Sequence, residues 1–215
     1  MADKKVIILG AGGHAKVVLE GIDIVQYKVE GFLDKDSSRK GEHISGFPVL
    51  GDDSDPGKWF SMGITCCIVG IGHVGHAELR NRLFLMYAAA GFEMINAVHP
   101  TAYISPGARM GSGTVIMPGA IVNSGAVIGD NCIINTAAVI EHDVKISNGV
   151  HIAPGCVIAG TSCIGDNTFI GAGTTVINGI CIGCNSIVGA GSVVVSNLPE
   201  NSLSLGIPAR VRKEI

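Results

Sequence analysis

Residues 120–143 read AIVNSG AVIGDN CIINTA AVIEHD, four consecutive blocks of six in which the third residue is always Val or Ile. Stepping by six in both directions finds an aliphatic residue or methionine at this place sixteen times in unbroken register. The sixteen positions are Ile104, Met110, Ile116, Val122, Ile128, Ile134, Ile140, Ile146, Ile152, Ile158, Ile164, Ile170, Val176, Ile182, Val188 and Val194. So regular a repeat predicts an architecture of stacked, equivalent units.

Each block of six predicts a short strand followed by a sharp corner. The residue two places before the aliphatic one is mostly small and should also point inward, and Gly or Asn recurs one and three places after it. Gly and Asn accept the positive φ that tight corners require. Three blocks close one coil, and successive coils stack at the parallel-strand spacing of about 4.8 Å. Residues 104–199 therefore predict just over five coils around a narrow ladder of Ile and Val.

The composition fits such a prism. Of the 215 residues 47% are hydrophobic but only 5% aromatic, and 31 are Gly. Charged residues make up 15%, against roughly 25% in ordinary soluble domains. The glycines do not recur every third residue, which excludes collagen, and the Ile and Val content argues against disorder. A narrow aliphatic prism has no room for rings, which explains their scarcity.

Charge and cysteine content indicate which partners and which cellular environment to expect. A net charge of −3 gives no electrostatic reason to expect nucleic acid. The apolar run Val6–Leu9 is too short for a signal-peptide core or a membrane span, so we expect a cytoplasmic protein without membrane contact. The seven cysteines are an odd number and are interpreted as reduced packing residues. Cys181-x-x-Cys184 lacks a second pair, so no metal site is predicted.

The first hundred residues predict a different organisation. Strands are expected at residues 4–9, 29–34, 64–69 and 92–98, with helices after residue 16 and over 76–90. This alternation predicts a small parallel sheet of Rossmann type. Gly10-x-Gly12-x-x-Ala15 fits the dinucleotide fingerprint, and Asp34 stands where a ribose-binding acid is expected. The motif leaves three interpretations open: NAD, a nucleotide sugar, or a purely structural turn.

The hexad run resembles the left-handed parallel β-helix of the hexapeptide-repeat acyltransferases. Gly206-Ile-Pro-Ala-Arg210 is similar to the element that closes such helices. With Gly12-Gly13-His14 in the N-terminal domain, the whole chain resembles one group of sugar acetyltransferases, those that include the UDP-4-amino-sugar N-acetyltransferase of the bacillosamine pathway and the sialic acid O-acetyltransferases. We therefore expect two domains, a Rossmann-like one over residues 1–100 and a left-handed β-helix over residues 101–215.

The resemblance implies an activity and its reactants. The expected reaction transfers acetyl from acetyl-CoA to the amino group of a UDP-linked 4-amino-sugar in bacterial glycan biosynthesis. O-acetylation of sialic acid or a related sugar hydroxyl is the alternative. Relatives are homotrimers with acetyl-CoA between neighbouring prisms, and the same is expected here. By the same likeness the acceptor would contact Gly12, Gly13, His14, Asp34, Lys35, Gly70, Gly72 and Asn135.

The strongest catalytic candidates lie at one corner of the repeat. Glu141-His142-Asp143 stands where most coils place small or neutral residues, and a corner side chain points away from the core. An adjacent carboxylate can orient an imidazole that acts as general base near neutral pH. In the resembling family the histidine of this motif takes a proton from the attacking amine or hydroxyl. His142 is therefore the expected base, with Asp143 or Glu141 as its partner.

The stacking predicts the neighbours of this corner. Gly160 lies one coil beyond His142, where the absence of a side chain admits an acyl group and a backbone N–H can stabilise an oxyanion. The resemblance assigns the acetyl-CoA contacts to His151, Gly160, Gly171, Ala172, Gly189 and Ala190. Tight corners also require small residues without any ligand. Two other classes stay open: an NAD-linked redox function and a noncatalytic scaffold trimer.

Overall fold

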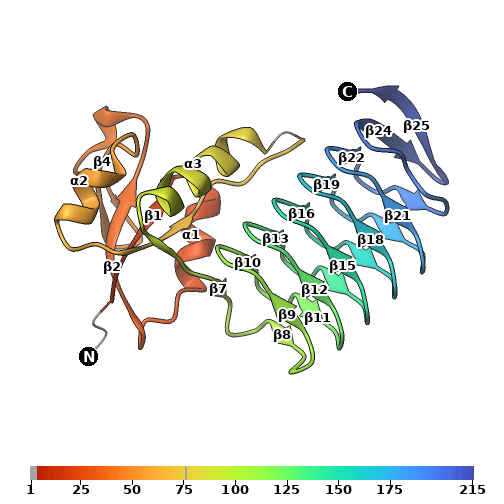
Figure 1. Cartoon of the computed structure of the whole chain (residues 1–215), viewed down its shortest axis with the longest axis horizontal. Helices are drawn as coiled ribbons and strands as arrows, with labels where there is room; N and C mark the ends of the chain where they lie inside the picture. Colours follow the sequence, from red (N-terminus) through yellow and green to blue (C-terminus); the bar gives the residue numbers. More distant parts are fainter. Residues whose placement is uncertain (1–3, 76) are drawn as a thin grey trace. The chain divides into compact units, whose positions relative to one another are not determined.

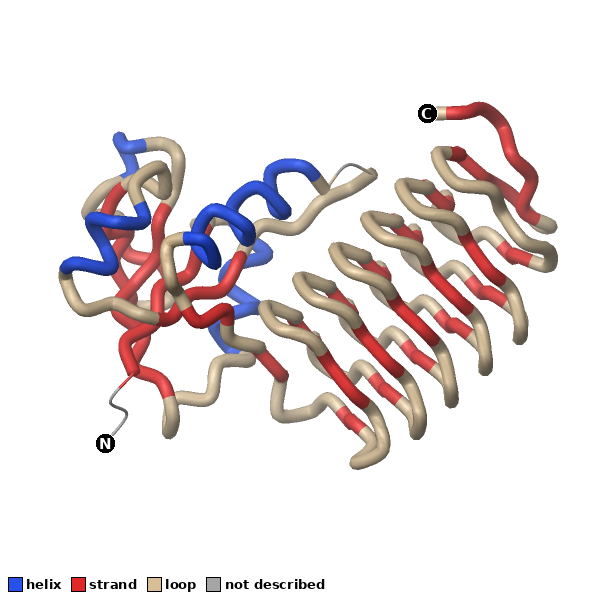
Figure 2. Tube along the Cα trace, viewed as in Figure 1, coloured by secondary structure: helices blue, strands red, loops and turns tan. Residues whose placement is uncertain are grey.

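The computed structural model describes residues 4–75 and 77–215. By their contacts these residues form two compact units, the first of residues 4–72 with 78–98 and the second of residues 73–75 and 77 with 99–215. Figure 1 labels their elements and Figure 2 separates helices from strands. The short segment after Gly72 thus belongs to the second unit, although it precedes the expected boundary at residue 100.

The first unit is built on a sheet whose strands run in the order β3-β4-β2-β1-β5-β6. Strands β1, β2, β4, β5 and β6 pair in parallel, and only β3 is antiparallel, to β4. Its elements are β1 Lys4–Leu9, α1 Gly13–Glu20, β2 Tyr27–Leu33, η1 Ser37–Arg39, β3 His43–Ile44, β4 Phe47–Gly51, α2 Pro56–Ser61, β5 Cys66–Val69, α3 Glu78–Ala89, β6 Glu93–Met94 and β7 Ala97–Val98.

Helices cover both faces of this sheet. Because side chains alternate along a strand, Ile7 and Leu9 of β1 face one side, where they join a buried cluster with Leu83 and Tyr87 of α3. On the other side Ile8 and Ala15 of α1 both lie within 3 Å of the place that a Cβ on Gly70 would occupy. The carboxyl ends of β1, β2, β4 and β5 therefore open at one edge, where such folds bind ligands.

Four details differ from the sequence-based expectation. The hairpin of β3 and β4 was not predicted; it turns at Ser45-Gly46, both with positive φ, as a two-residue hairpin requires. Helix α2 was also not predicted, although Asp55 caps it by accepting from the N–H of Lys58 and Pro56 begins it. The single strand expected over 92–98 is two short strands, β6 and β7. The expected helix begins at Glu78, and His76 lies outside the described residues.

The second unit is a three-sided parallel β-helix (Figure 1, green to blue). Its sixteen two-residue strands each end on one of the sixteen predicted positions. They are β8 Tyr103–Ile104, β9 Arg109–Met110, β10 Val115–Ile116, β11 Ile121–Val122, β12 Val127–Ile128, β13 Ile133–Ile134, β14 Val139–Ile140, β15 Lys145–Ile146, β16 His151–Ile152, β17 Val157–Ile158, β18 Cys163–Ile164, β19 Phe169–Ile170, β20 Thr175–Val176, β21 Cys181–Ile182, β22 Ile187–Val188 and β23 Val193–Val194. From Ile116 onward every one of these inward residues is buried.

Successive coils are joined by their corners as well as by their strands. Residues eighteen apart pair across coils, as Val122, Ile140 and Ile158 do. At one corner the side chain of each coil accepts from the backbone of the coil before it: Asp130 from the N–H of Ser112, Asn148 from that of Asp130, and Asp166 from that of Asn148. This ladder satisfies corner N–H groups that the strands leave unpaired.

An antiparallel hairpin of β24 Ser202–Gly206 and β25 Ala209–Glu214 pairs with β22 and ends the β-helix, its turn formed by Ile207-Pro208. Cys66, Cys67, Cys132 and Cys156 are buried, as packing residues should be. The packing interpretation is wrong for Cys181, which is exposed, because it occupies an outward strand position.

Candidate active site

A cavity of about 430 Å³ opens at the carboxyl edge of the first unit's sheet. Seven of the eight residues expected to bind the acceptor line it; they are Gly12, Gly13, His14, Asp34, Lys35, Gly70 and Gly72. They come from the turn after β1, the end of β2 and the turn after β5, which the parallel pairing brings together. The eighth, Asn135, lies on the β-helix.

The glycines of the first turn have separate geometric roles. Gly10 has φ +102°, which favours glycine, and a Cβ there would also collide with Ile71. A Cβ on Gly12 or Gly13 would have no described atom within 4 Å, so the space above the N-terminus of α1 is open. The N-cap residue of that helix is Gly12, which supplies no side-chain cap. N–H groups at a helix start are suited to a phosphate.

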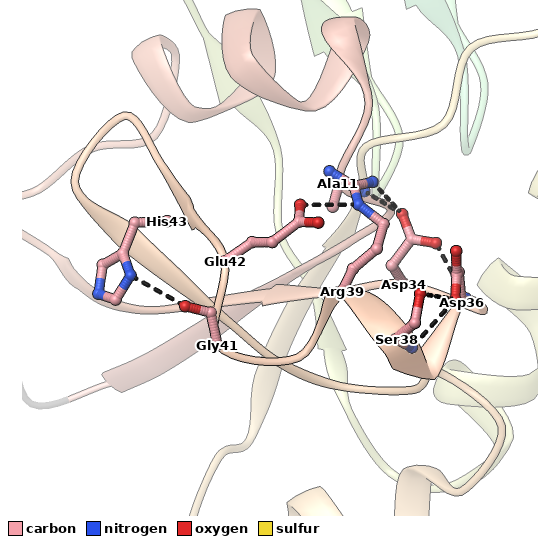
Figure 3. A network of polar contacts seen from close by, with 8 residues as sticks. All are labelled: Ala11, Asp34, Asp36, Ser38, Arg39, Gly41, Glu42 and His43. Atoms are coloured by element: carbon pink, nitrogen blue, oxygen red, sulfur yellow. Dashed lines mark hydrogen bonds and ion pairs between the residues drawn. The ribbon is translucent and has the colours of Figure 1, made fainter.

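Asp34 ties this turn to the segment after β2 (Figure 3). Its Oδ2 accepts from the N–H of Ala11 at 3.2 Å and from Nη1 of Arg39 at 2.9 Å, and its Oδ1 accepts from the N–H of Asp36 at 3.1 Å. Arg39 in turn donates from Nε to Glu42 at 2.9 Å. The predicted ribose-binding acid therefore also shapes the glycine turn beside it.

Three lining residues were missed by the sequence reasoning: Asp53, Leu79 and Arg82. Asp53 follows β4, and because that strand was not predicted, its carboxyl end was not recognised as part of the edge. Leu79 and Arg82 lie on α3 and carry no motif. An acid two residues beyond a short strand was the one signal available.

On the β-helix, His142 and Asp143 form an exposed pair. Nδ1 of His142 lies 2.9 Å from Oδ2 of Asp143, and the side chains are 62% and 64% exposed. A carboxylate can only accept, so Nδ1 carries the hydrogen and the lone pair of a neutral ring is on Nε2. Asp143 holds φ at +60°, which turns the carboxylate back beside its neighbour.

Glycines on the coils above and below make room for this pair. A Cβ on Gly160 would lie 2.6 Å from Nε2 of His142, and a Cβ on Gly125 would collide with the carboxylate of Asp143. Gly160 donates no backbone hydrogen bond to another described residue. Glu141 accepts from the backbone N–H of His142 at 3.4 Å, and not from the ring. The geometry thus pairs the imidazole with Asp143.

His151 has a different environment. It is 6% exposed, its Nδ1 lies 2.7 Å from the carbonyl oxygen of His73, and its ring packs edge-on against those of His73 and Phe169. The carbonyl fixes the hydrogen on Nδ1, so Nε2 accepts from Nδ2 of Asn135 at 3.0 Å. Oδ1 of Asn135 accepts from the N–H of Thr136. Both ring nitrogens of His151 are therefore used in hydrogen bonds within the protein, one to His73 and one to Asn135.

The other residues expected at acetyl-CoA occupy a second corner of the prism. Asn135, Gly171 and Gly189 stack in the corner that precedes the strands β14, β20 and β23, with two coils between Asn135 and Gly171 and one between the two glycines. His142 and Gly160 are in the corner that follows β14 and β17. A Cβ on Gly171 would meet the backbone of Gly189 and Ala190, so stacking alone requires glycine there. Ala172 and Ala190 are exposed. Within a single prism, therefore, this corner does not lie beside His142.

A glycine-lined pocket on an α/β unit and an exposed histidine–aspartate pair on a three-sided β-helix define the hexapeptide-repeat class of acyltransferases. Family models support both halves: the PglD N-terminal domain matches residues 5–86, and the bacterial transferase hexapeptide of six repeats matches residues 107–140 and 125–160.

Solved structures resemble the whole chain. A variant of perosamine N-acetyltransferase from Caulobacter crescentus, in complex with CoA and GDP-perosamine, is 38% identical over 99% of both chains, with a TM-score of 0.91. The acetyltransferase domain of PglB from Neisseria gonorrhoeae is 33% identical over 97% of this chain and 100% of that one, with a TM-score of 0.88. WeeI from Acinetobacter baumannii, 23% identical over 97% and 99% with a TM-score of 0.81, shares the fold.

The chain belongs to the hexapeptide-repeat sugar acetyltransferases with a PglD-type N-terminal domain. The predicted fold, a Rossmann-like domain followed by a left-handed β-helix, is confirmed, and so is the prediction of an acyltransferase. Within the described ranges no helix has the length and apolarity to cross a bilayer. No group of three metal-ligating side chains was found among those same residues.

Proposed function

We propose that this chain transfers acetyl from acetyl-CoA to the 4-amino group of a nucleotide-linked sugar, with His142 as general base. The observation that carries the proposal is the exposed His142–Asp143 pair beside Gly160. Membership of the family supports acetyl-CoA as the donor, since the PglB domain has been solved with acetyl coenzyme A and the perosamine enzyme with CoA.

The chemistry follows from the atoms at the corner. The sugar amine attacks the acetyl carbonyl, forming a C–N bond, and the C–S bond to CoA breaks. Nε2 of His142 takes the proton that the amine loses and passes it on to the departing thiolate, while the hydrogen on Nδ1 stays in its bond to the Asp143 carboxylate. The N–H of Gly160 is our candidate for stabilising the oxyanion, a contribution of about 3 kcal/mol for one such donor.

The acceptor is tested by mass spectrometry of nucleotide-linked sugars incubated with the enzyme and acetyl-CoA. The panel pairs each 4-amino-sugar with the matched 4-hydroxy-sugar and includes free sialic acid. We expect a mass gain of one acetyl group on the amino-sugars alone. Acetylation of hydroxyls, with amines untouched, would replace this proposal with the O-acetyltransferase alternative.

We assign the nucleotide part of the acceptor to the cavity on the first unit. Open space above Gly13 and the uncapped start of α1 support a phosphate there. Gly13→Val is expected to weaken binding of the nucleotide sugar and to leave acetyl-CoA affinity unchanged. Micromolar binding of NADH, or loss of both affinities together, would contradict this division.

A homotrimer with the active site between subunits completes the proposal. His142 and the corner of Gly171 are at opposite ends of one prism face, His142 after strand β14 and Gly171 before strand β20. That face carries exposed Tyr103, Ile121 and Val157, apolar surface suited to a neighbouring prism. Light scattering should give three times the mass of one chain, and a fully active monomer would rule this arrangement out.

Seven free cysteines support a reducing, cytoplasmic setting.

A further inference from the structure

Three neighbouring strands of the first unit end on three parts of the same cavity. The order β4-β2-β1 places the turn of Gly12 and Gly13 at β1, Asp34 at the end of β2 and Asp53 beyond the end of β4. A nucleotide whose phosphates lie at α1 and whose ribose lies at Asp34, as the fingerprint implies, continues outward along this edge. A base attached to such a ribose would lie towards β4, on the side of the cavity that Asp53 lines.

Asp53 is a buried acid with unused acceptor capacity. The residue is 9% exposed, and apart from its own backbone no donor in the described part of the chain bonds its carboxylate. Asp34, by comparison, accepts three hydrogen bonds. Burial first, and then the charge of Asp34, raise the pKa of Asp53. A buried carboxylate whose single donor is its own backbone is costly, so this position is suited to a ligand that brings further donors.

The backbone around Asp53 is held in place. Its carbonyl oxygen accepts from the hydroxyl of Tyr87 at 3.3 Å, and the carbonyl of Asp52 accepts from Nε1 of Trp59 at 3.2 Å. Both aromatic residues are buried in the core. The backbone that carries the Asp53 carboxylate at the cavity wall is therefore anchored to the core.

The two oxygens of a carboxylate match one common base. Guanine presents two adjacent donors, N1–H and the exocyclic N2–H, whereas uracil presents a single N3–H between two carbonyl oxygens that a carboxylate repels. Adenine and cytosine each place an acceptor beside their donor. We propose that Asp53 reads the Watson–Crick edge of the base and that the acceptor is a guanine nucleotide sugar, in place of the UDP-sugar expected from the sequence.

This assignment rests on the proposed function for the location of the phosphates, but its test needs no acetyl transfer. Calorimetry with GDP, IDP and UDP measures the affinity of the protein for each. We expect GDP to bind roughly tenfold to a hundredfold more tightly than UDP, and more tightly than IDP, which lacks the exocyclic amine. Because these three titrations use the unaltered protein, they decide the question even if a variant fails to fold.

Asp53→Asn is the matched variant and Asp52→Asn its neighbouring control. Asp53→Asn should lower GDP affinity towards that of UDP and IDP, and Asp52→Asn should keep the preference for GDP. UDP binding more tightly than GDP in the unaltered protein would overturn the proposal. An equal loss for all three nucleotides in Asp53→Asn would also overturn it, by placing the carboxylate on the ribose.

Thermal unfolding checks that Asp53→Asn remains folded. Because the pKa of Asp53 is raised in the folded protein, its ionised form destabilises the fold at neutral pH. Asp53→Asn removes that charge, so it should unfold at a higher temperature than the unaltered protein at pH 7. The difference should shrink once the pH falls below the raised pKa of Asp53, and it should be gone below the ordinary pKa of aspartate.

Discussion

Two histidines nine residues apart on the β-helix have opposite environments. His142 stands exposed at a corner with Asp143 on Nδ1 and glycine on the next coil. His151 is buried on a face, where the carbonyl of His73 and the amide of Asn135 hold both ring nitrogens. Both carry hydrogen on Nδ1, but only His142 keeps a lone pair that a substrate can reach. The surroundings of the two histidines, rather than their residue type, distinguish the proposed base from a residue with a structural role.

Removing His142 should have the largest effect. His142→Ala is expected to lower kcat/KM by roughly 10²- to 10⁴-fold, because it removes the proposed general base. Melting temperature and acetyl-CoA affinity should be unchanged, since the ring is exposed. Steady-state kinetics with the acetylated product quantified would check this, and a fully active variant would remove His142 from the mechanism.

Displacing the ring without removing it is the next test. In Gly160→Ala the new Cβ would lie 2.6 Å from Nε2, so the imidazole must swing away from its position. We expect kcat to fall by about a hundredfold, the order of effect that a misplaced catalytic group produces. Asn178→Ala, the equivalent corner position one coil further, serves as the control and should retain the rate.

The partner of His142 can be identified by a matched pair of amides. Asp143→Asn preserves shape and tolerates positive φ, but it weakens the bond to Nδ1; we expect kcat to fall by about tenfold. Glu141→Gln should stay within about twofold, because Glu141 contacts backbone rather than ring. If Glu141→Gln were the slower enzyme, the geometric assignment of the partner would be reversed.

The smallest change in rate is expected at His151. His151→Phe removes the donor to the carbonyl of His73 and should lower the free energy of unfolding by about 1–3 kcal/mol. The loss should be seen in chemical denaturation, whereas His142→Ala should show none. A large fall in kcat with unchanged stability would instead favour the direct role at acetyl-CoA expected from the resemblance.

Sequence reasoning succeeded where structure is local and repeated. All sixteen strands end on predicted positions, since every coil meets the same steric conditions. The glycine turn and Asp34 were found because their spacing is set by one strand and one helix. Asp53 was missed, since β4 joins the sheet through pairing with β2 that short sequence windows do not reveal. The environment of His151 depends on His73, seventy-eight residues earlier, which no local pattern encodes.

The eighteen-residue pairing between coils restricts how this protein can change in length. Val122, Ile140 and Ile158 stay on one face because exactly one coil separates them. An insertion or deletion of any other size would rotate all later residues onto the wrong faces. Each coil contacts only its neighbours, so whole coils can be gained or lost near the ends of the β-helix. The His142 corner, with coils on both sides, would keep its geometry while the molecule grows or shrinks by modular steps.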